Sequence, residues 1–410
     1  MTENISRWAA KAVDHALTVR RIVYIAGARQ TGKTTLLDQV SFSGADCRSL
    51  DDDAMRLAAA SAPKEFVART TAGPMMIDEV QKVPELFPAM KMRVDKDRTP
   101  GQYLITGSTS LSANPNVTES LAGRMKTVRL RSLAEGEFLR LAPGFLDGAF
   151  EGDFSNPPSG YDKRRIIDIA FRGGYPEASA LPPEERKDWH LDYLDALLSH
   201  DVRDIQEIRK LSALRRMALG LYGYSSKFLN KSEFARACEV SKPTVETYIA
   251  ALEALYLFDQ VPPWSPRDYD RAAKSSKWFA SDTGTMAALL DWSRENVFFD
   301  PDKSGKLIET FAYHELAAEA DLTNQHRIYH YRDEDKREID FLISTADGHL
   351  LGIEVKAGSV VRADDFKHMT WFRDRYAPGM VCIALYAGDA VLPFGSKRFA
   401  VPFSSLFGRT

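Results

Sequence analysis

Eight consecutive residues carry the strongest chemical signal in the sequence. Residues 27–34 read Gly-Ala-Arg-Gln-Thr-Gly-Lys-Thr and match the phosphate-binding loop pattern G-x-x-x-x-G-K-[ST]. The two glycines of the pattern let successive backbone N–H groups point inward at the phosphates of a nucleotide. Lys33 is predicted to reach the β- and γ-phosphates, and the Thr34 hydroxyl to complete the coordination of Mg²⁺. The predicted nucleotide contacts are Gly27, Ala28, Arg29, Gln30, Thr31, Gly32, Lys33, Thr34 and Thr35.

Two acids could provide the remaining groups that hydrolysis of a nucleotide needs. Residues 74–79 form an apolar strand that ends in Asp78 and Glu79. At the carboxyl end of a strand beside the loop, Asp78 can hold Mg²⁺ through water, and Glu79 can polarise the water that attacks the γ-phosphate. The apolar run is short, and alone it would fit a surface turn equally well. Both motifs in this order predict ATP hydrolysis, and no N-K-x-D string is present to read guanine.

A third strand end and a later arginine could complete this site. Residues 102–105 predict a strand that leads to Thr106 and Ser108, either of which could sense the γ-phosphate. An ordinary Gly-Ser turn is the alternative. Arg124 could stabilise charge in the transition state, in the same chain or in a neighbouring subunit. A surface ion pair is the alternative for Arg124.

The last hundred residues contain a second group of acids. Residues 337–343 and 351–356 alternate between apolar and polar side chains, and between them 346–348 read Ala-Asp-Gly. This sequence suits a three-residue hairpin loop with glycine in the left-handed position. The resulting register sets Phe341 opposite Ile353 on the apolar face and Asp340 beside Glu354 on the polar face.

Such neighbouring carboxylates require a cation. With Cβ atoms about 5 Å apart they repel each other unless a positive charge lies between them. Mg²⁺ is the natural candidate, and Lys356 could position or deprotonate a water molecule beside it. The alternative is a solvated sheet face on which Glu338 pairs with Lys356 and Arg337 pairs with Glu354.

Residues 228–261 have the spacing of a helix-turn-helix. Residues 231–238 predict a short helix, and a second helix begins after Ser241, which can cap it, with Pro243 in its first turn. A strand over 256–261 and a possible wing follow. Glu246 on the second helix opposes the approach of a phosphate, and such domains also serve as lids or subunit contacts. Basic and aromatic residues that would suit a nucleic-acid backbone interleave after the strand: Trp264, Arg267, Tyr269, Arg271, Lys274, Lys277 and Trp278.

Other segments connect and support these sites. An amphipathic helix is predicted before a strand over 22–26, and a short strand over 47–50. Residues 142–160 are rich in Gly, Pro, Ser and Asp and predict a linker. The pattern over 161–226 is mostly helical.

Several strings together resemble a prokaryotic AAA-type ATPase that carries a C-terminal domain of unknown function, the 4143 family. The resemblance rests on residues 27–37, 77–81, 104–108, 121–124, 173–177, 309, 337–340 and 353–356, and covers nearly the whole chain. Asp340 and Glu354-x-Lys356, with Glu309 on a preceding helix, resemble the catalytic core of PD-(D/E)xK nucleases. This resemblance implies phosphodiester cleavage, with Glu309, Asp340 and Glu354 as metal ligands and Lys356 as a catalytic residue. Ile339 stands where that pattern has proline.

Composition limits the remaining possibilities. A chain of 410 residues is too long for one core, and a net charge of −3 confines any nucleic-acid surface to a local patch. Three scattered cysteines indicate a reducing cytoplasm and exclude a cysteine zinc site. No apolar run approaches the roughly 18 residues that span a bilayer.

We therefore expect a cytoplasmic, multidomain α/β protein without a membrane span. The leading hypothesis is Mg²⁺-dependent ATP hydrolysis coupled to DNA binding, and to DNA cleavage if the C-terminal site is active. The alternative is an ATP-dependent switch that binds a protein partner and carries a catalytically silent nuclease-like domain. A homo-oligomer is expected. The predicted regions are an AAA-type P-loop domain with a parallel sheet over 1–145, a linker and helical connector over 146–226, a winged helix over 227–295 and a PD-(D/E)xK-like α/β domain over 296–410.

Overall fold

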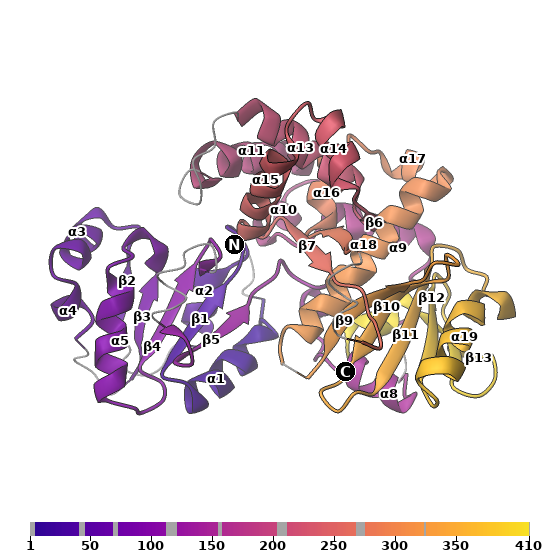
Figure 1. Cartoon of the computed structure of the whole chain (residues 1–410), viewed down its shortest axis with the longest axis horizontal. Helices are drawn as coiled ribbons and strands as arrows, with labels where there is room; N and C mark the ends of the chain where they lie inside the picture. Colours follow the sequence, from indigo (N-terminus) through magenta and orange to yellow (C-terminus); the bar gives the residue numbers. More distant parts are fainter. Residues whose placement is uncertain are drawn as a thin grey trace.

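The computed structural model arranges the chain as two α/β units on either side of a helical middle unit (Figure 1). The N-terminal unit comprises the first five strands, and the C-terminal unit follows residue 300. No helix among the described residues combines the length and hydropathy needed to cross a membrane. The residues described are 5–40, 46–68, 73–111, 121–154, 158–202, 211–267, 275–323 and 325–409.

A five-stranded parallel sheet in the order β2-β3-β4-β1-β5 forms the N-terminal unit. Parallel strands are buried on both faces, which explains the continuous apolar runs at β1 and β4. The predicted strands are confirmed, and β4 lies between β3 and β1. The strands are β1 (Ile22–Ala26), β2 (Asp46–Ser49), β3 (Met75–Asp78), β4 (Tyr103–Gly107) and β5 (Met125–Arg129).

Helices cover both faces of this sheet. The predicted amphipathic helix, α1 (Ala9–Val19), lies with α2 (Lys33–Gln39) on one face. The other face packs against α4 (Pro63–Phe66) and α5 (Leu86–Lys96) through buried side chains such as Phe87. Two further elements complete the unit, α3 (Asp53–Ser61) and the 3₁₀ turn η1 (Val80–Lys82). The carboxyl ends of β1, β3 and β4 therefore meet at one end of the sheet.

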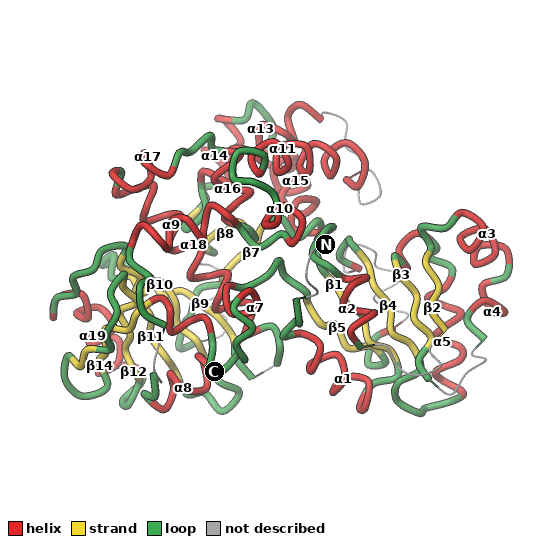
Figure 2. The backbone as a smooth tube through the Cα atoms, turned by 180° about the vertical axis from the view of Figure 1, so that it is seen from behind, coloured by secondary structure: helices red, strands yellow, loops and turns green. Residues whose placement is uncertain are grey.

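Two helices follow this sheet, α7 (Glu135–Phe138) and α8 (Phe145–Glu151). The prediction of a linker over 142–160 is wrong at α8, where Phe145, Leu146 and Ala149 are buried in the core of the C-terminal unit. Figure 2 shows α8 against the C-terminal sheet, whose strands come some two hundred residues later in the chain. The segment is rich in turn-forming residues, but burial of its apolar side chains against the C-terminal unit stabilises a helix there.

The middle unit is mainly helical, as predicted. A small antiparallel sheet in the order β6-β8-β7 adjoins its last helices. Ser241 accepts a hydrogen bond from the Thr244 N–H at 3.3 Å, and Pro243 lies in the first turn of the helix that follows, which confirms the predicted cap. The elements are α9 (Lys163–Arg172), α10 (Pro176–Ala180), α11 (Arg186–Ala196), the π-helix η3 (Leu197–Asp201), α13 (Leu211–Gly223), β6 (Lys227–Phe228), α14 (Lys231–Ala237), α15 (Lys242–Ala254), β7 (Phe258–Val261), β8 (Lys277–Ala280), α16 (Thr283–Leu289) and α17 (Arg294–Phe299).

The predicted basic and aromatic wing is wrong at three positions. Lys277 and Trp278 belong to β8 and are buried, and Trp264 packs against Phe372 and Tyr376 of the C-terminal unit. Arg267 is exposed. Tyr269, Arg271 and Lys274 lie outside the described residues. The described part of this segment therefore offers one exposed cation rather than a basic surface.

The C-terminal unit contains a six-stranded sheet in the order β13-β14-β12-β11-β10-β9. The long helix α18 (Pro301–Ala320) packs on one face, and α19 (Lys367–Tyr376) packs on the other. The remaining elements are β9 (Arg327–Arg332), β10 (Glu338–Ser344), β11 (Leu350–Lys356), η5 (Ala363–Phe366), β12 (Val381–Tyr386), β13 (Leu392–Pro393), β14 (Arg398–Pro402) and η6 (Phe403–Phe407).

The predicted hairpin register of this unit is confirmed. Phe341 faces Ile353, Ile343 faces Leu351, and Gly348 has a φ of 86° in the loop. A slip of one residue would have moved every apolar side chain to the other face.

Carboxylates of α18 bind the start of α7 and α8. Glu315 accepts hydrogen bonds from the Glu135 N–H at 3.0 and 3.1 Å, and Glu319 accepts from the N–H groups of Phe145 and Leu146 at 3.1 and 2.9 Å. Burial raises the pKa of Glu319 to about 7, although these N–H donors oppose the shift. The segment after β5 is therefore held by the C-terminal unit.

Candidate active site

The phosphate-binding loop makes a tight turn between β1 and α2. Gln30 and Gly32 have φ values of 64° and 89°, in the left-handed region that favours glycine. A Cβ atom on Gly27 would lie 2.2 Å from the carbonyl oxygen of Leu130, so this close approach requires glycine. Lys33 Nζ donates to the carbonyl oxygens of Gly27 at 3.1 Å and Ala28 at 2.9 Å. The ammonium of Lys33 thus lies within the phosphate-binding loop, where it was predicted to contact phosphate.

The residues predicted to hold Mg²⁺ at this loop lie together. The Thr34 hydroxyl donates to Asp78 Oδ2 at 2.9 Å, and the Thr106 hydroxyl donates to the other carboxylate oxygen of Asp78. Mg²⁺ prefers such oxygen ligands and commonly binds through one or two carboxylates and water. Thr34 and Asp78 therefore fit the predicted ion.

Glu79 is held in an unusual backbone conformation. Its φ is 56°, and its N–H donates to the Thr106 hydroxyl at 3.1 Å. One carboxylate oxygen lies 3.9 Å from Lys33 Nζ, while the other accepts hydrogen bonds from the Ser108 hydroxyl at 3.0 Å and from the Gln81 amide. Left-handed conformations outside glycine cost about 1–3 kcal/mol and cluster at functional sites. Ser108 acts on Glu79 here, and the role of Gln81 was not predicted.

A cavity of about 890 Å³ opens at this loop. Lys33, Thr34 and Glu79 line one side. Phe138 lines it from α7, and Pro176 and Glu177 line it from α10. The helices α7 and α10 therefore close a space that is large enough for a nucleotide.

Two buried contacts that the sequence did not reveal support the loop. The guanidinium of Arg7 donates to the carbonyl oxygen of Thr31 at 2.6 Å and to Glu137 at 3.0 Å, and Arg7 is 6% exposed. From α11, the Tyr193 hydroxyl donates to the carbonyl oxygen of Arg29 at 3.0 Å. No local pattern identifies either side chain, because each partner is distant in the sequence.

Arg124 lies at the opposite end of the sheet. It precedes β5, where Met125 pairs with Ile22 at the start of β1. Five residues of strand, about 16 Å, separate this end from the phosphate-binding loop. The Arg124 guanidinium binds Asp95 at 2.6 and 2.9 Å, and this contact raises the pKa of Arg124 and lowers that of Asp95. The expectation of a finger within the same chain is therefore wrong, and a role in a neighbouring subunit stays a prediction.

The carboxylates of the C-terminal unit also gather, but not as predicted. Asp340 Oδ2 accepts a hydrogen bond from the Val355 N–H at 2.9 Å, while Lys356 Nζ lies 3.2 Å from Glu354 and 3.3 Å from Asp365. The predicted cross-strand pairs of Glu338 with Lys356 and of Arg337 with Glu354 are wrong. Arg337 binds the loop acids Asp333 and Asp335 at 2.9 and 2.7 Å.

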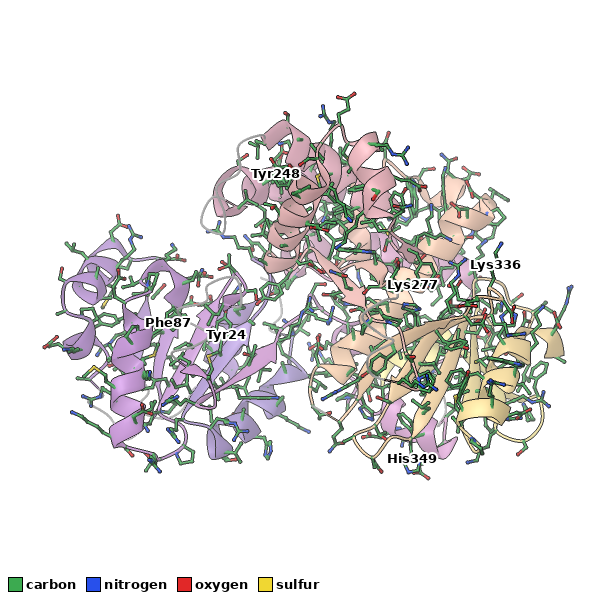
Figure 3. The ribbon with its side chains drawn as sticks, viewed as in Figure 1. Tyr24, Phe87, Tyr248, Lys277, Lys336 and His349 are labelled. Carbon is green, nitrogen blue, oxygen red and sulfur yellow. The ribbon has the colours of Figure 1, made fainter. Side chains whose placement is uncertain are left out.

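A buried lysine occupies the place assigned to a metal ion. Lys277 Nζ lies 2.6 Å from Glu309 Oε1 and 3.0 Å from Glu338 Oε1 and Asp340 Oδ1. Figure 3 labels Lys277 where the middle unit meets the C-terminal sheet. No cluster of three or more His, Cys, Asp and Glu arranged to hold a metal ion occurs within the described part of the chain. While Lys277 Nζ lies among these acids, they leave no position for Mg²⁺ at this second site.

The lysine and its acids shift one another's ionisation. Burial opposes the charge on Lys277, but Glu309, Asp340 and Glu338 hold the pKa of its ammonium well above the usual value. Burial, followed by the charge of Asp340, raises the pKa of Glu309 to about 8. The same two causes raise the pKa of Glu354 well above its ordinary range. These carboxylates bind protons more readily than exposed ones.

Comparison with known proteins agrees with the N-terminal site. Residues 19–139 match the family described as AAA domain, 163–296 match a domain of unknown function (DUF8612), and 304–406 match a domain of unknown function (DUF4143). These matches support the predicted combination of a P-loop ATPase domain over 19–139 and a DUF4143 domain over 304–406. Its N-terminal domain binds ATP, normally with Mg²⁺.

Two relatives and two solved structures show similarity. The chain is 28% identical over 357 residues to the uncharacterized protein Rv2008c of Mycobacterium tuberculosis and to Mb2031c of Mycobacterium bovis, covering 86% of this chain and 74% of each relative. The Walker-type ATPase PABY2304 of Pyrococcus abyssi has a TM-score of 0.41 at 11% identity, over 68% of this chain and 94% of that chain. AMPPCP-bound DnaA of Aquifex aeolicus has a TM-score of 0.26 at 15% identity, over 60% and 85%.

Proposed function

We propose that this protein is an ATP-dependent switch, in which hydrolysis at Glu79 changes the contacts between the sheet of the ATPase domain and the helix-turn-helix of the middle unit. One observation carries the proposal. Two residues beyond Ser108, the Ser110 N–H donates to the carbonyl oxygen of Ala254, the last residue of α15, at 2.9 Å. The strand end that holds Glu79 is therefore bonded to the middle unit.

The chemistry at the loop follows from the placement of its side chains. Bound ATP with Mg²⁺ supplies the phosphoanhydride bond. The ammonium of Lys33 neutralises phosphate charge, and Thr34 and Asp78 provide oxygen ligands for the ion. Oε1 of Glu79 faces Lys33 and accepts a proton from the attacking water, while Ser108 and Gln81 hold Oε2.

Several buried contacts connect this site to the middle unit. The Tyr24 hydroxyl on β1 donates to the Thr109 carbonyl oxygen at 2.7 Å and also contacts Tyr256, which follows α15. At the end of β5, Arg131 binds Asp259 of β7 at 2.6 Å. A displacement of the segment after Ser108 would therefore move α15 and β7.

The switch is tested by Tyr24→Phe, which removes the hydroxyl that contacts Thr109 and Tyr256. ATP hydrolysis is expected to continue, because the Tyr24 hydroxyl donates to the Thr109 carbonyl oxygen and not to the carboxylate of Glu79. The change in hydrogen–deuterium exchange that ATP induces in α15 and β7 is expected to fall by at least half. Lys33→Ala is expected to lose both ATP hydrolysis and the exchange response.

Tyr103→Phe is the matched control. Tyr103 is equally buried on the neighbouring β4, but its hydroxyl donates to the Val67 carbonyl oxygen at 2.7 Å, within the same domain. Its exchange response should equal that of the wild type. If Tyr24→Phe behaves like Tyr103→Phe, the proposed connection is wrong. A wild-type protein whose α15 and β7 do not respond to ATP would exclude the switch itself.

DNA is the proposed partner of the middle unit. Two helices joined by a short turn, beside an antiparallel sheet in the order β6-β8-β7, support the hypothesis of a winged helix. We also propose that the protein forms a homo-oligomer in which Arg124 acts on a neighbouring subunit. Native mass measured with and without ATP tests this assembly.

Metal-dependent DNA cleavage is the second candidate function. It is favoured by Glu309 and Asp340, which converge on one buried point, and by Glu354 and Lys356 on the neighbouring strand β11. Cleavage would require Lys277 to leave these acids. Linear and circular DNA are incubated with Mg²⁺ and ATP, beside an Asp340→Ala variant. Equal survival of DNA with both proteins, while ATP is still hydrolysed, would exclude cleavage.

A further inference from the structure

We infer that Lys277, and not a metal ion, neutralises a group of acids in the C-terminal unit. This ion-pair latch fixes the middle sheet to the C-terminal unit. The latch acids are Glu309, Glu338 and Asp340. This inference goes beyond the proposed switch, and it does not depend on ATP hydrolysis.

Lys277 donates hydrogen bonds to Glu338 and Asp340 and forms an ion pair with Glu309. An ammonium group has three N–H donors. Nζ has three carboxylate oxygens within 3.0 Å, one each from Glu309, Glu338 and Asp340. Lys277 is 1% exposed, so water does not compete for these donors. The three carboxylates nearest to this ammonium therefore all belong to the C-terminal unit.

The spacing of the oxygens suits an ammonium rather than Mg²⁺. They lie 2.6 to 3.0 Å from Nζ, the ordinary range for N–H···O contacts with a charged donor. Mg²⁺ requires oxygen ligands at about 2.0–2.1 Å in near-octahedral geometry. A metal ion at the Nζ position would therefore require Lys277 to leave and the carboxylates to close inward.

The backbone of Lys277 is held on both sides of β8. Lys277 pairs with Phe228 of β6 on one side of β8 and with Val261 of β7 on the other. Just after β7, the chain exchanges hydrogen bonds with β9, since the Trp264 N–H donates to the His330 carbonyl oxygen at 2.7 Å. The backbone at position 277 is therefore fixed on both sides, and Nζ could leave the acids only by rotation of the side chain.

The charges explain why the lysine is needed. Glu309 on α18 and Glu338 and Asp340 on β10 converge on one buried point, where unpaired carboxylates would repel each other at low dielectric. Lys356 lies closer to Glu354 and Asp365, and no contact places it at that point. Removing one partner of a buried ion pair leaves an uncompensated charge. Lys277 thus joins α18, β10 and β8 in one ionic contact.

A first experiment measures metal binding without nucleotide. Wild type and Asp340→Asn are titrated with Mn²⁺, and the free ion is followed by electron paramagnetic resonance. Both proteins are expected to bind the same amount, because Lys277 excludes the ion from the latch. An additional Mn²⁺ ion in the wild type that Asp340→Asn loses would overturn the inference. Glu338→Gln serves the same purpose if Asp340→Asn does not fold.

A second experiment measures thermal unfolding of the full-length chain. Lys277→Met removes the charge and keeps most of the side-chain volume, and it is expected to lower the unfolding midpoint by about 5 °C or more. Adding Glu309→Gln to that variant should restore part of the loss, because it removes one of the repelling carboxylates. Lys187→Met is the matched control, since its ion pair with Asp291 is exposed, and its midpoint should stay within about 2 °C of the wild type.

The outcomes separate this inference from the proposed switch. If Lys277→Met unfolds at the wild-type midpoint, or if the double variant is less stable than Lys277→Met alone, the latch is wrong. If the single variant does not fold, recovery of folded protein in the double variant supports the latch, and no recovery overturns it. Hydrolysis of ATP by the folded variants is measured in parallel, and its loss in Glu79→Gln bears on the switch alone.

Discussion

Glu79→Gln is expected to slow ATP hydrolysis by about 10²- to 10⁴-fold while ATP still binds. Glutamine keeps the size of the side chain and an oxygen that can accept the hydrogen bond of Ser108. Its amide cannot take a proton from water. The phosphate-binding loop and Lys33 are unchanged in this variant, so nucleotide affinity should stay close to that of the wild type. Steady-state phosphate release and equilibrium binding of a fluorescent ATP analogue measure the two effects separately.

Glu177→Gln is the control for this variant. Glu177 lines the same cavity from α10, and no ion pair joins it to Lys33 among the contacts of the described residues. It should hydrolyse ATP at nearly the wild-type rate. Wild-type hydrolysis by Glu79→Gln would show that another group accepts the proton.

Asp259→Asn is expected to lower the free energy of unfolding by about 3–5 kcal/mol at pH 7. Asp259 is 8% exposed and lies 2.7 Å from the Arg129 guanidinium, 2.6 Å from that of Arg131 and 3.0 Å from the Tyr313 hydroxyl. In the Asp259→Asn variant the neutral amide no longer balances the charge of Arg131, which is 8% exposed. Asp321 would then be the remaining acid paired with Arg131 among the described residues. The three units share this contact, so denaturant unfolding of the whole chain reports its loss.

The effect of Asp259 should depend on pH in one direction. Burial favours the neutral acid, but Arg129 and Arg131 hold the pKa of Asp259 well below its usual value. A lowered native-state pKa contributes stability that is fully present above about pH 5 and is lost as the pH falls below about 4. The difference between wild type and Asp259→Asn should therefore be constant at neutral pH and shrink in acid.

Asp302→Asn provides the comparison for this prediction. Asp302 pairs with Lys306 at 2.9 Å on the exposed face of α18, where an ion pair contributes about 0–1 kcal/mol. Equal destabilisation by the two substitutions would mean that burial of the Asp259 pair has no particular importance. A difference that grows in acid would contradict the assigned direction of the pKa shift.

Local patterns predicted the parts of this structure that depend on neighbouring residues. The loop over 27–34, the acids after β3 and the cap at Ser241 each depend on a few consecutive residues. The hairpin register followed from two alternating strands and the glycine at position 348. In each case short-range geometry allows few arrangements, and burial of one face selects between them.

Contacts between distant residues could not be predicted in this way. Lys277 follows a segment rich in basic residues, which suggested a solvated wing, and its three partners lie more than thirty residues further along the chain. Arg7 binds Glu137 across 130 residues. A buried ion pair has no sequence period, because its partners are chosen by how whole elements pack. The helix α8 could not be predicted either, because it is stabilised by packing against strands far along the chain.

The carboxylates of α18 limit where the chain can be truncated. The matches to known families suggest three pieces, yet a fragment that stops before α18 would lack the acceptors for the N–H groups of Glu135, Phe145 and Leu146. A fragment that begins at α18 would in turn retain Glu315 and Glu319 without those donors. Expression of isolated regions would yield incomplete folds on both sides of the cut. The three regions therefore depend on one another for complete hydrogen bonding, and a stable fragment would need new partners for these groups.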